Sequence, residues 1–140
     1  MKTTKSSLYV LDSFALLAYL EDEPGSARVG DLLARAQKGR VEIWMSIINF
    51  GEVVYIVERE RGRDSAKIAI AAIDQLPVAV AGADRLLTFG AAHIKAHHAI
   101  SYADAFAVAL AQSKGGSVVT GDPEFKNVES LVLVEWLRDV

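Results

Sequence analysis

Short apolar runs alternate with longer segments of helical periodicity along the chain. The runs are four or five residues long and contain β-branched residues, a pattern typical of buried strands. They predict five strands, at Ser7–Leu11, Val41–Met45, Pro77–Val80, Ser117–Thr120 and Leu131–Val134.

The segments between these runs predict helices, and their ends carry the usual boundary signals. Ser46 is suited to cap the start of a helix that stops at Gly62, and Gly39 and Gly115 also follow helical segments. The predicted helices are Phe14–Leu20, Pro24–Gly39, Ser46–Gly62, Arg63–Leu76, Ala83–Ala96 and Ser101–Ser113.

Strands that are separated by helices favour parallel pairing with right-handed crossovers. We therefore expect an α/β fold, a three-layer α/β/α sandwich around a central, mainly parallel sheet of about five strands. The chain has 140 residues, of which 51% are hydrophobic and 24% charged, enough to bury a packed core. This length predicts a single domain over residues 1–140.

Charge and cysteine content exclude several classes of protein. Fifteen Lys and Arg against eighteen Asp and Glu give a formal net charge of −3, which argues against a nucleic-acid binder that relies on bulk positive charge. A nucleic-acid enzyme with a local patch or a bound metal ion stays compatible with this charge. The chain has no cysteine, so disulfide scaffolds, thiolate zinc sites and cysteine nucleophiles are excluded.

The N-terminal region resembles a signal peptide only superficially. Asp12 interrupts its apolar stretch, and Glu21 follows Leu20 where a cleavage site would be needed. Apolar runs such as Phe14–Leu20 have seven residues, whereas a membrane span needs about 20. We expect a soluble, cytoplasmic protein with no membrane partner.

Four acidic residues follow predicted strands or lie early in the helices after them. Asp12 and Asp122 lie at or just past the ends of the first and fourth strands, Asp104 lies in the first turn of a helix, and Glu52 lies within the helix after the second strand. In open parallel sheets, ligands bind beyond the carboxyl ends of the strands. We therefore expect these four side chains to converge there.

Local structural roles are an alternative for three of the four acids. Asp12 is suited to cap a helix, Asp104 completes a capping-box pattern with Ser101, and Asp122 lies in an ordinary turn sequence. Glu52 is harder to explain locally, because apolar residues surround its helix and no basic residue lies within one turn. A buried carboxylate needs a compensating cation or hydrogen-bond donors.

A divalent metal ion would account for all four acids together. Clustered carboxylates repel one another and raise each other's pKa, and a bound Mg²⁺ or Mn²⁺ removes this penalty. Such an ion also activates water and stabilises the charge of a phosphodiester under attack. The acids alone therefore suggest metal-assisted phosphoryl chemistry.

The order of these motifs resembles the PIN-domain ribonucleases, and the size is most like the VapC toxins of type II toxin–antitoxin systems. The motifs are Asp12-Ser13, Glu52, the segment Ser101–Ala105 and the segment Thr120–Phe125. The resemblance implies a PIN fold with the metal and catalytic positions at Asp12, Glu52, Asp104 and Asp122. Ser13 and Thr120 would support the site, with Thr120 matching the family's hydroxyl before the last acid.

Glu124 stands where many PIN domains have aspartate, so it would contact either a second metal ion or only its bound waters. The resemblance further implies Mg²⁺- or Mn²⁺-dependent endoribonuclease action on structured RNA. A homodimer and inhibition by a cognate VapB-like antitoxin are implied as well. The main alternative is a PIN-like binding or scaffold module that has lost catalysis.

Other site types match the sequence less well. A haloacid-dehalogenase phosphatase needs a second aspartate where Phe14 stands, and no phosphate-binding glycine loop is present. His93 and His97 are one helical turn apart but lack the glutamate of a zinc-protease motif. A basic cluster would form either a solvated helix end or an RNA contact. Its members are Arg59, Arg61, Arg63 and Lys67.

Two segments, Ile47–Val57 and Ile68–Leu76, are more apolar than the surface of a lone monomer requires. They are the candidate surface for dimerisation.

Overall fold

The computed structural model describes residues 7–137, which contain a five-stranded parallel sheet in the order β3-β2-β1-β4-β5. Every neighbouring pair of strands is parallel, with β1 at the centre between β2 and β4. The strands are β1 Leu8–Leu11, β2 Glu42–Ser46, β3 Ala79–Ala81, β4 Ser117–Thr120 and β5 Leu133–Trp136. The predicted α/β fold with a parallel five-stranded sheet is thereby confirmed.

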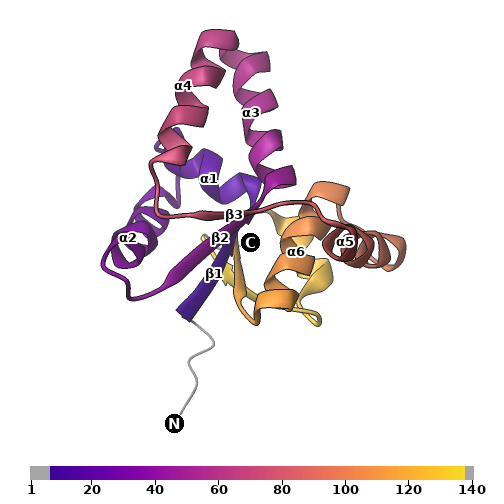
Figure 1. Ribbon diagram of the computed structural model, residues 1–140. Coiled ribbons are helices and arrows are strands. Elements are labelled where there is room, and N and C mark those ends of the chain that lie inside the picture. Colours follow the sequence, from indigo (N-terminus) through magenta and orange to yellow (C-terminus); the bar gives the residue numbers. More distant parts are fainter. Residues whose placement is uncertain (1–6, 138–140) are drawn as a thin grey trace.

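Helices cover both faces of this sheet, as Figure 1 shows. The helices are α1 Ser13–Leu20, α2 Ser26–Gln37, α3 Ile47–Arg61, α4 Arg63–Asp74, α5 Arg85–His97 and α6 Tyr102–Lys114, with a 3₁₀ helix, η2, at Pro123–Val128. Strand alternation sends Tyr9 and Leu11 into the core under α1 to α4, and Val10 into the core under α5, α6 and η2. The two cores lie on opposite faces of the sheet, so the molecule has three layers: helices, sheet and helices.

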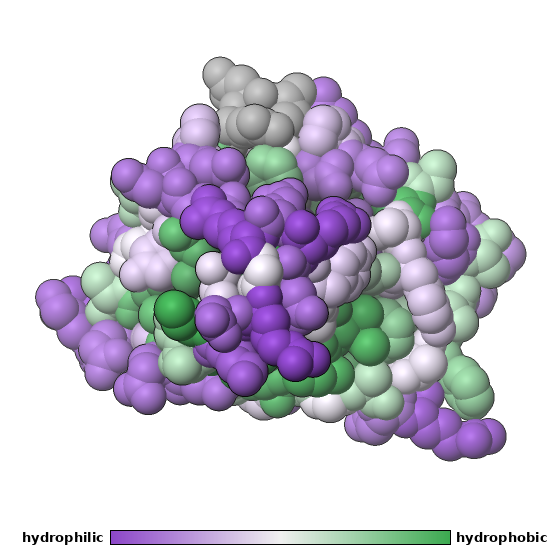
Figure 2. Space-filling view, turned by 90° about the horizontal axis from the view of Figure 1, so that it is seen from above, coloured by the Kyte–Doolittle hydropathy of each residue, from purple (hydrophilic) through white to green (hydrophobic). Residues whose placement is uncertain are grey.

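Helices α3 and α4 form a hairpin that projects from the sheet (Figure 1). The two helices meet at Gly62, whose positive φ of 95° favours glycine. Figure 2 views the molecule from the side of this hairpin and shows hydrophilic residues at the centre with hydrophobic residues beside them. Large apolar side chains stay exposed along the hairpin, namely Ile47, Tyr55, Ile68 and Ile70.

Some element boundaries differ from the predicted ones. The last strand begins at Leu133 and not at Leu131, because the Leu131 N–H donates to the Val128 carbonyl and extends the preceding turn. The 3₁₀ helix η2 was not predicted. It forms because the Asp122 side chain accepts the Glu124 N–H and Pro123 begins the first turn. This helix positions Glu124 beside the sheet edge.

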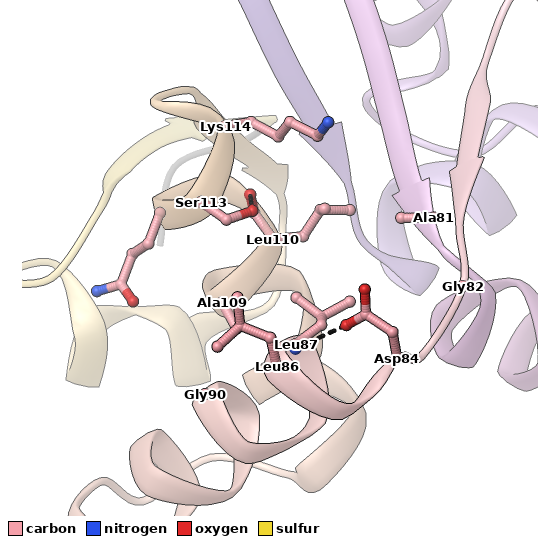
Figure 3. Close-up of a pocket in the computed structure, with 11 residues that line it drawn as sticks. Ala81, Gly82, Asp84, Leu86, Leu87, Gly90, Ala109, Leu110, Ser113 and Lys114 are labelled. Carbon is pink, nitrogen blue, oxygen red and sulfur yellow. Dashed lines mark hydrogen bonds between the residues drawn. The ribbon is translucent and has the colours of Figure 1, made fainter.

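A largely apolar groove of about 490 Å³ lies between the start of α5, the end of α6 and the end of β3 (Figure 3). Asp84 contributes its one carboxylate, and that carboxylate accepts the Leu87 N–H and caps α5. The groove therefore lacks convergent acids. Over residues 7–137, none of the helices combines the length and apolar character needed to cross a membrane.

Candidate metal centre

The four acids singled out in the sequence line one cavity at the carboxyl edge of the sheet. Asp12 directly follows β1, Asp122 follows β4 by one residue, Asp104 lies in the first turn of α6, and Glu52 lies in α3. Ser13 and Glu124 line the same cavity, which has a volume of about 390 Å³. The parallel strand order thus brings together residues from four separate elements.

Asp12 is almost fully buried and is held at both carboxylate oxygens. Its Oδ1 accepts the Ala15 N–H at 2.8 Å, which caps α1, and its Oδ2 accepts the Thr120 hydroxyl at 2.5 Å. Burial raises the pKa of Asp12 to about 8; the Thr120 and Ala15 hydrogen bonds oppose this rise, and the charges of Asp104 and Asp122 add to it. Asp12 therefore caps α1 and at the same time belongs to the acidic cluster.

Thr120 connects the carboxyl ends of the neighbouring strands β4 and β1. Its hydroxyl donates to Asp12 and accepts the Asp122 N–H at 3.0 Å. Between Thr120 and Asp122 the chain has Gly121, where a Cβ atom would overlap the ring of Phe14. The close approach of that ring explains why glycine is needed at this position.

Asp104, Asp122 and Glu124 form the tightest group of acids. One carboxylate oxygen of each lies within 4.8 Å of the other two. Burial raises the pKa of Asp104 to about 7, with further contributions from the charges of Asp122, Glu52 and Glu124 and an opposing hydrogen bond from Ser101. The Asp104 N–H donates to Ser101 Oγ at 3.1 Å, so Ser101 caps α6 while the Asp104 carboxylate faces its acidic neighbours.

Glu52 differs from the expectation of a wholly apolar environment. It is half-buried, and its neighbours Gly51 and Tyr55 are exposed because the hairpin projects from the sheet. Its Oε1 accepts the Ser13 hydroxyl at 2.5 Å. The compensating donor for this carboxylate therefore comes from the first turn of α1.

A family model for the PIN domain matches residues 9–131. The chain belongs to the PIN-domain family. The resemblance noted from the sequence motifs is thereby confirmed, and the sheet order and acidic cavity described above are features of this PIN domain.

Several solved structures are similar to this PIN domain in fold. VapBC2 from Rickettsia felis, bound to a DNA fragment from its promoter, has a TM-score of 0.73 and 16% identity over 91% of this chain and 97% of that chain. DNA-bound VapBC from Salmonella typhimurium has a TM-score of 0.72 and 17% identity over 93% and 98%. VapC20 from Mycobacterium tuberculosis, a sarcin–ricin loop cleaving toxin, has a TM-score of 0.62 and 23% identity over 84% and 92%. A search of curated proteins by sequence found no match.

Two buried polar residues lie beside the acids; Ser46 was predicted only as a helix cap, and Asn49 was not singled out in the sequence. Ser46 and Asn49 have no exposed surface, and the Asn49 amide donates to both Ser13 Oγ and the Ala103 carbonyl. The signal that could have found them is spacing, because Ser46, Asn49 and Glu52 follow one another at intervals of three along α3. A buried asparagine in an apolar helix needs hydrogen-bond partners. The three-residue spacing places Asn49 on the same side of α3 as Glu52.

The cavity of this PIN domain has the donor set that a hard divalent cation requires. Among residues 7–137 its lining contains five carboxylates and the hydroxyls of Ser13 and Ser101, and none of these lining residues is basic. Oxygen ligands of this kind suit Mg²⁺ or Mn²⁺. The raised pKa values of Asp12 and Asp104 come first from burial and then from the charges of neighbouring acids, and a bound cation would offset both costs. The residues therefore fit a divalent metal ion.

Other candidate groups from the sequence lie outside this cavity. His93 and His97 contact each other edge to face on α5, with ring centroids 4.9 Å apart. The basic cluster lies where α3 meets α4, and there Arg61 pairs with Glu21 at 3.4 Å. Within residues 7–137, neither group contributes to the cavity lining.

Proposed function

We propose that this PIN domain is a Mg²⁺- or Mn²⁺-dependent endoribonuclease that hydrolyses RNA phosphodiester bonds as the toxin of a toxin–antitoxin pair. The observation that carries this proposal is the convergence of five carboxylates in one cavity, to whose lining the described part of the chain contributes no basic side chain. The proposal includes a single domain over residues 1–140 and a cytoplasmic location. In the cytoplasm the protein would encounter cellular RNA.

Each acid has a distinct part in the proposed site. Asp104 and Asp122 would hold the metal ion, with Glu124 as a further ligand or a partner of its waters. Asp12, fixed at both oxygens, adds charge beneath them. Glu52 accepts a hydrogen bond from the Ser13 hydroxyl at Oε1, which leaves Oε2 to orient a water molecule and accept its proton.

A bound divalent ion would supply positive charge that offsets the raised pKa values of Asp12 and Asp104 and would favour attack of water on the phosphodiester. The residues of the chain provide the orientation. Thr120 and Ser13 hold one oxygen each of Asp12 and Glu52, so the two carboxylates do not have to reorganise when RNA binds.

The decisive experiment is cleavage of RNA by the purified full chain with Mg²⁺ or Mn²⁺ and with EDTA. Cleavage that requires the metal ion and is absent from an Asp104→Asn preparation supports the proposal. A catalytically inactive scaffold is the alternative, and it would give no cleavage above the EDTA control. Structured RNAs are the substrates to use first, because the similar VapC20 is a sarcin–ricin loop cleaving toxin.

A cognate VapB-like antitoxin is the proposed partner of this site. Similar folds occur in VapBC complexes. Phe14, Leu17 and Ile56 form an apolar wall beside the carboxylates, so a partner segment with a basic residue flanked by apolar ones would complement the cavity. Co-expression of such a partner should relieve growth arrest, and removal of its Arg or Lys should abolish the relief.

A homodimer is the proposed assembly. The α3–α4 hairpin carries an apolar groove of about 480 Å³ that includes Ile47, Tyr55 and Ile70, each of which is exposed. Burying this groove against a second copy would remove that apolar surface from water. Sedimentation equilibrium tests this, with Tyr55→Asp expected to shift the chain toward monomer.

A further inference from the structure

We propose that Asn49 is a positioning residue that sets the relative placement of α1, α3 and α6, and through them the geometry of the metal centre. This inference rests on the proposed function, because it assigns a role within that site. Asn49 lies in the first turn of α3 and is fully buried. Its side chain reaches residues 36 and 54 positions away in the sequence.

The orientation of the Asn49 amide is determined by its partners. One side-chain atom lies 3.1 Å from the Ala103 carbonyl oxygen, which can only accept a hydrogen bond, so this atom is the Nδ2 donor. The other proton on Nδ2 is donated to Ser13 Oγ at 3.3 Å. A single amide group therefore joins the starts of α1 and α6.

The side-chain oxygen of Asn49 is held by Ser46, the last residue of strand β2. Oδ1 accepts the Ser46 hydroxyl at 2.7 Å, and Ser46 Oγ in turn accepts the Asn49 N–H at 3.0 Å. Ser46 is the last residue of β2 and the cap of α3, and it is also fully buried. This reciprocal pair ties the Asn49 side chain to the carboxyl end of a strand.

Both donor contacts of the amide lead to an acid of the site. Ser13 is adjacent to Asp12, and Ala103 is adjacent to Asp104. Ser13 Oγ accepts a hydrogen bond from Asn49 Nδ2 and donates one to Glu52 Oε1 at 2.5 Å. The alternative acceptor, the backbone carbonyl of Asn49, is more distant at 3.2 Å. The hydrogen bonds thus run in one direction, from the amide through the serine hydroxyl to the glutamate.

Buried networks of this kind fix geometry because every member is satisfied only in one arrangement. Repulsion between the acids acts to separate α1, α3 and α6 before a cation binds. The Asn49 bridges oppose that separation by joining the three elements beneath the carboxylates. Groups that orient ligands in this way typically change metal affinity by about 10- to 100-fold when removed.

The test replaces Asn49 with leucine, which has a similar size but no donors, in the full chain. We expect the Mn²⁺ dissociation constant, measured by calorimetry, to rise about tenfold or more. RNA cleavage at subsaturating Mn²⁺ should fall in parallel. Asn49→Ser, which is smaller and also lacks the two amide donors, is the second variant if the leucine protein does not fold.

A matched control separates positioning from general destabilisation. Ile94→Ala removes a buried side chain from α5, which carries none of the five acids. It should lower the melting temperature in EDTA and leave the Mn²⁺ dissociation constant unchanged. Equal Mn²⁺ affinity in wild type and Asn49→Leu, or an equal loss in Ile94→Ala, would overturn the proposal.

A double-mutant cycle tests the route to Glu52. Ser13→Ala should weaken Mn²⁺ binding less than Asn49→Leu, because the Ala103 contact remains. The Mn²⁺ dissociation constant of the double variant should rise by less than the product of the fold-increases in the two single variants. Strictly additive losses would contradict a shared path through Ser13.

The outcomes for the proposed function and for Asn49 are distinct. Metal-dependent cleavage that is unaffected by Asn49→Leu, together with unchanged Mn²⁺ affinity, overturns the positioning role and leaves the proposed function standing. A wild-type chain that binds Mn²⁺ but cleaves no RNA overturns the proposed function, while the affinities still decide the role of Asn49. A chain that does neither overturns both.

Discussion

The side-chain hydroxyl of Thr120 donates a 2.5 Å hydrogen bond to Oδ2 of Asp12. The two residues are 108 positions apart and end the neighbouring parallel strands β4 and β1. The bond favours the ionised form of a carboxylate whose pKa burial raises. It therefore keeps Asp12 oriented and more acidic than burial alone would allow.

Replacing Thr120 with valine should test this bond with little change in volume. The variant loses the donor to Asp12 and the acceptor for the Asp122 N–H, so the free energy of unfolding should fall by about 1–2 kcal/mol. Metal-dependent RNA cleavage near pH 7 should fall as the pKa of Asp12 rises further. Denaturant unfolding and initial rates measure both effects. Thr120→Ser should retain the wild-type values, and a fully active valine variant would show that the bond is dispensable.

Asp12→Asn, Asp104→Asn and Asp122→Asn should each reduce metal-dependent cleavage by about a hundredfold or more. Each substitution removes a charge and keeps the shape of the side chain. Initial rates at saturating Mn²⁺ measure the loss, and circular dichroism checks the fold. Asp84→Asn is the matched control, because Asp84 caps α5 outside the acidic cavity. Near wild-type rates in two of the three site variants would refute the metal-site assignment.

The metal-free protein should lose stability as the pH rises from about 5 to 8.5. The pKa values of Asp12, about 8, and Asp104, about 7, lie above the ordinary value of 3.8, so the folded state binds more protons than the unfolded state in this range. The stability that protonation contributes is complete below about pH 4. It falls progressively as the pH rises, until the pH has passed the folded-state pKa values of about 7 and 8. Urea unfolding in EDTA across this range measures the slope.

Added Mn²⁺ should change the sign of that dependence, because the ion binds the deprotonated carboxylates. Asp84→Asn should retain the negative slope in EDTA, since Asp84 lies outside the cavity. A flat or rising stability in EDTA would mean that Asp12 and Asp104 ionise freely in the folded protein.

The convergence of the acids could be predicted from the sequence because topology alone determines it. Parallel strands end at one edge, so Asp12 and Asp122, which follow strands, had to approach each other. Glu124 could be associated with the site only through the family resemblance, since its position depends on the unpredicted 3₁₀ helix η2 and on which way its first turn points.

The surroundings of α3 were harder to predict for a different reason. Hydrophobic periodicity does not distinguish a buried helix from one in a projecting hairpin, so Glu52 was expected to be more enclosed than it is. The role of Asn49 depends on partners in α1 and α6, and no local pattern specifies hydrogen bonds over such sequence separations. Local spacing indicated only that a polar residue faced the same side as Glu52.

Asp104→Asn should raise the stability of the metal-free protein even though it abolishes cleavage. The Asp104 carboxylate is buried beside Asp122 and Glu124, so neutralising it relieves repulsion by about 1–2 kcal/mol. The cap of α6 should persist, because Ser101 Oγ accepts the Asp104 backbone N–H, which the substitution keeps. Mn²⁺ should stabilise the wild type strongly and the variant much less. Melting temperatures in EDTA and in Mn²⁺ measure both differences. If the carboxylate chiefly supported the helix start, the substitution would lower stability equally with and without the metal ion, and the acidic cluster would not be a site of stored repulsion.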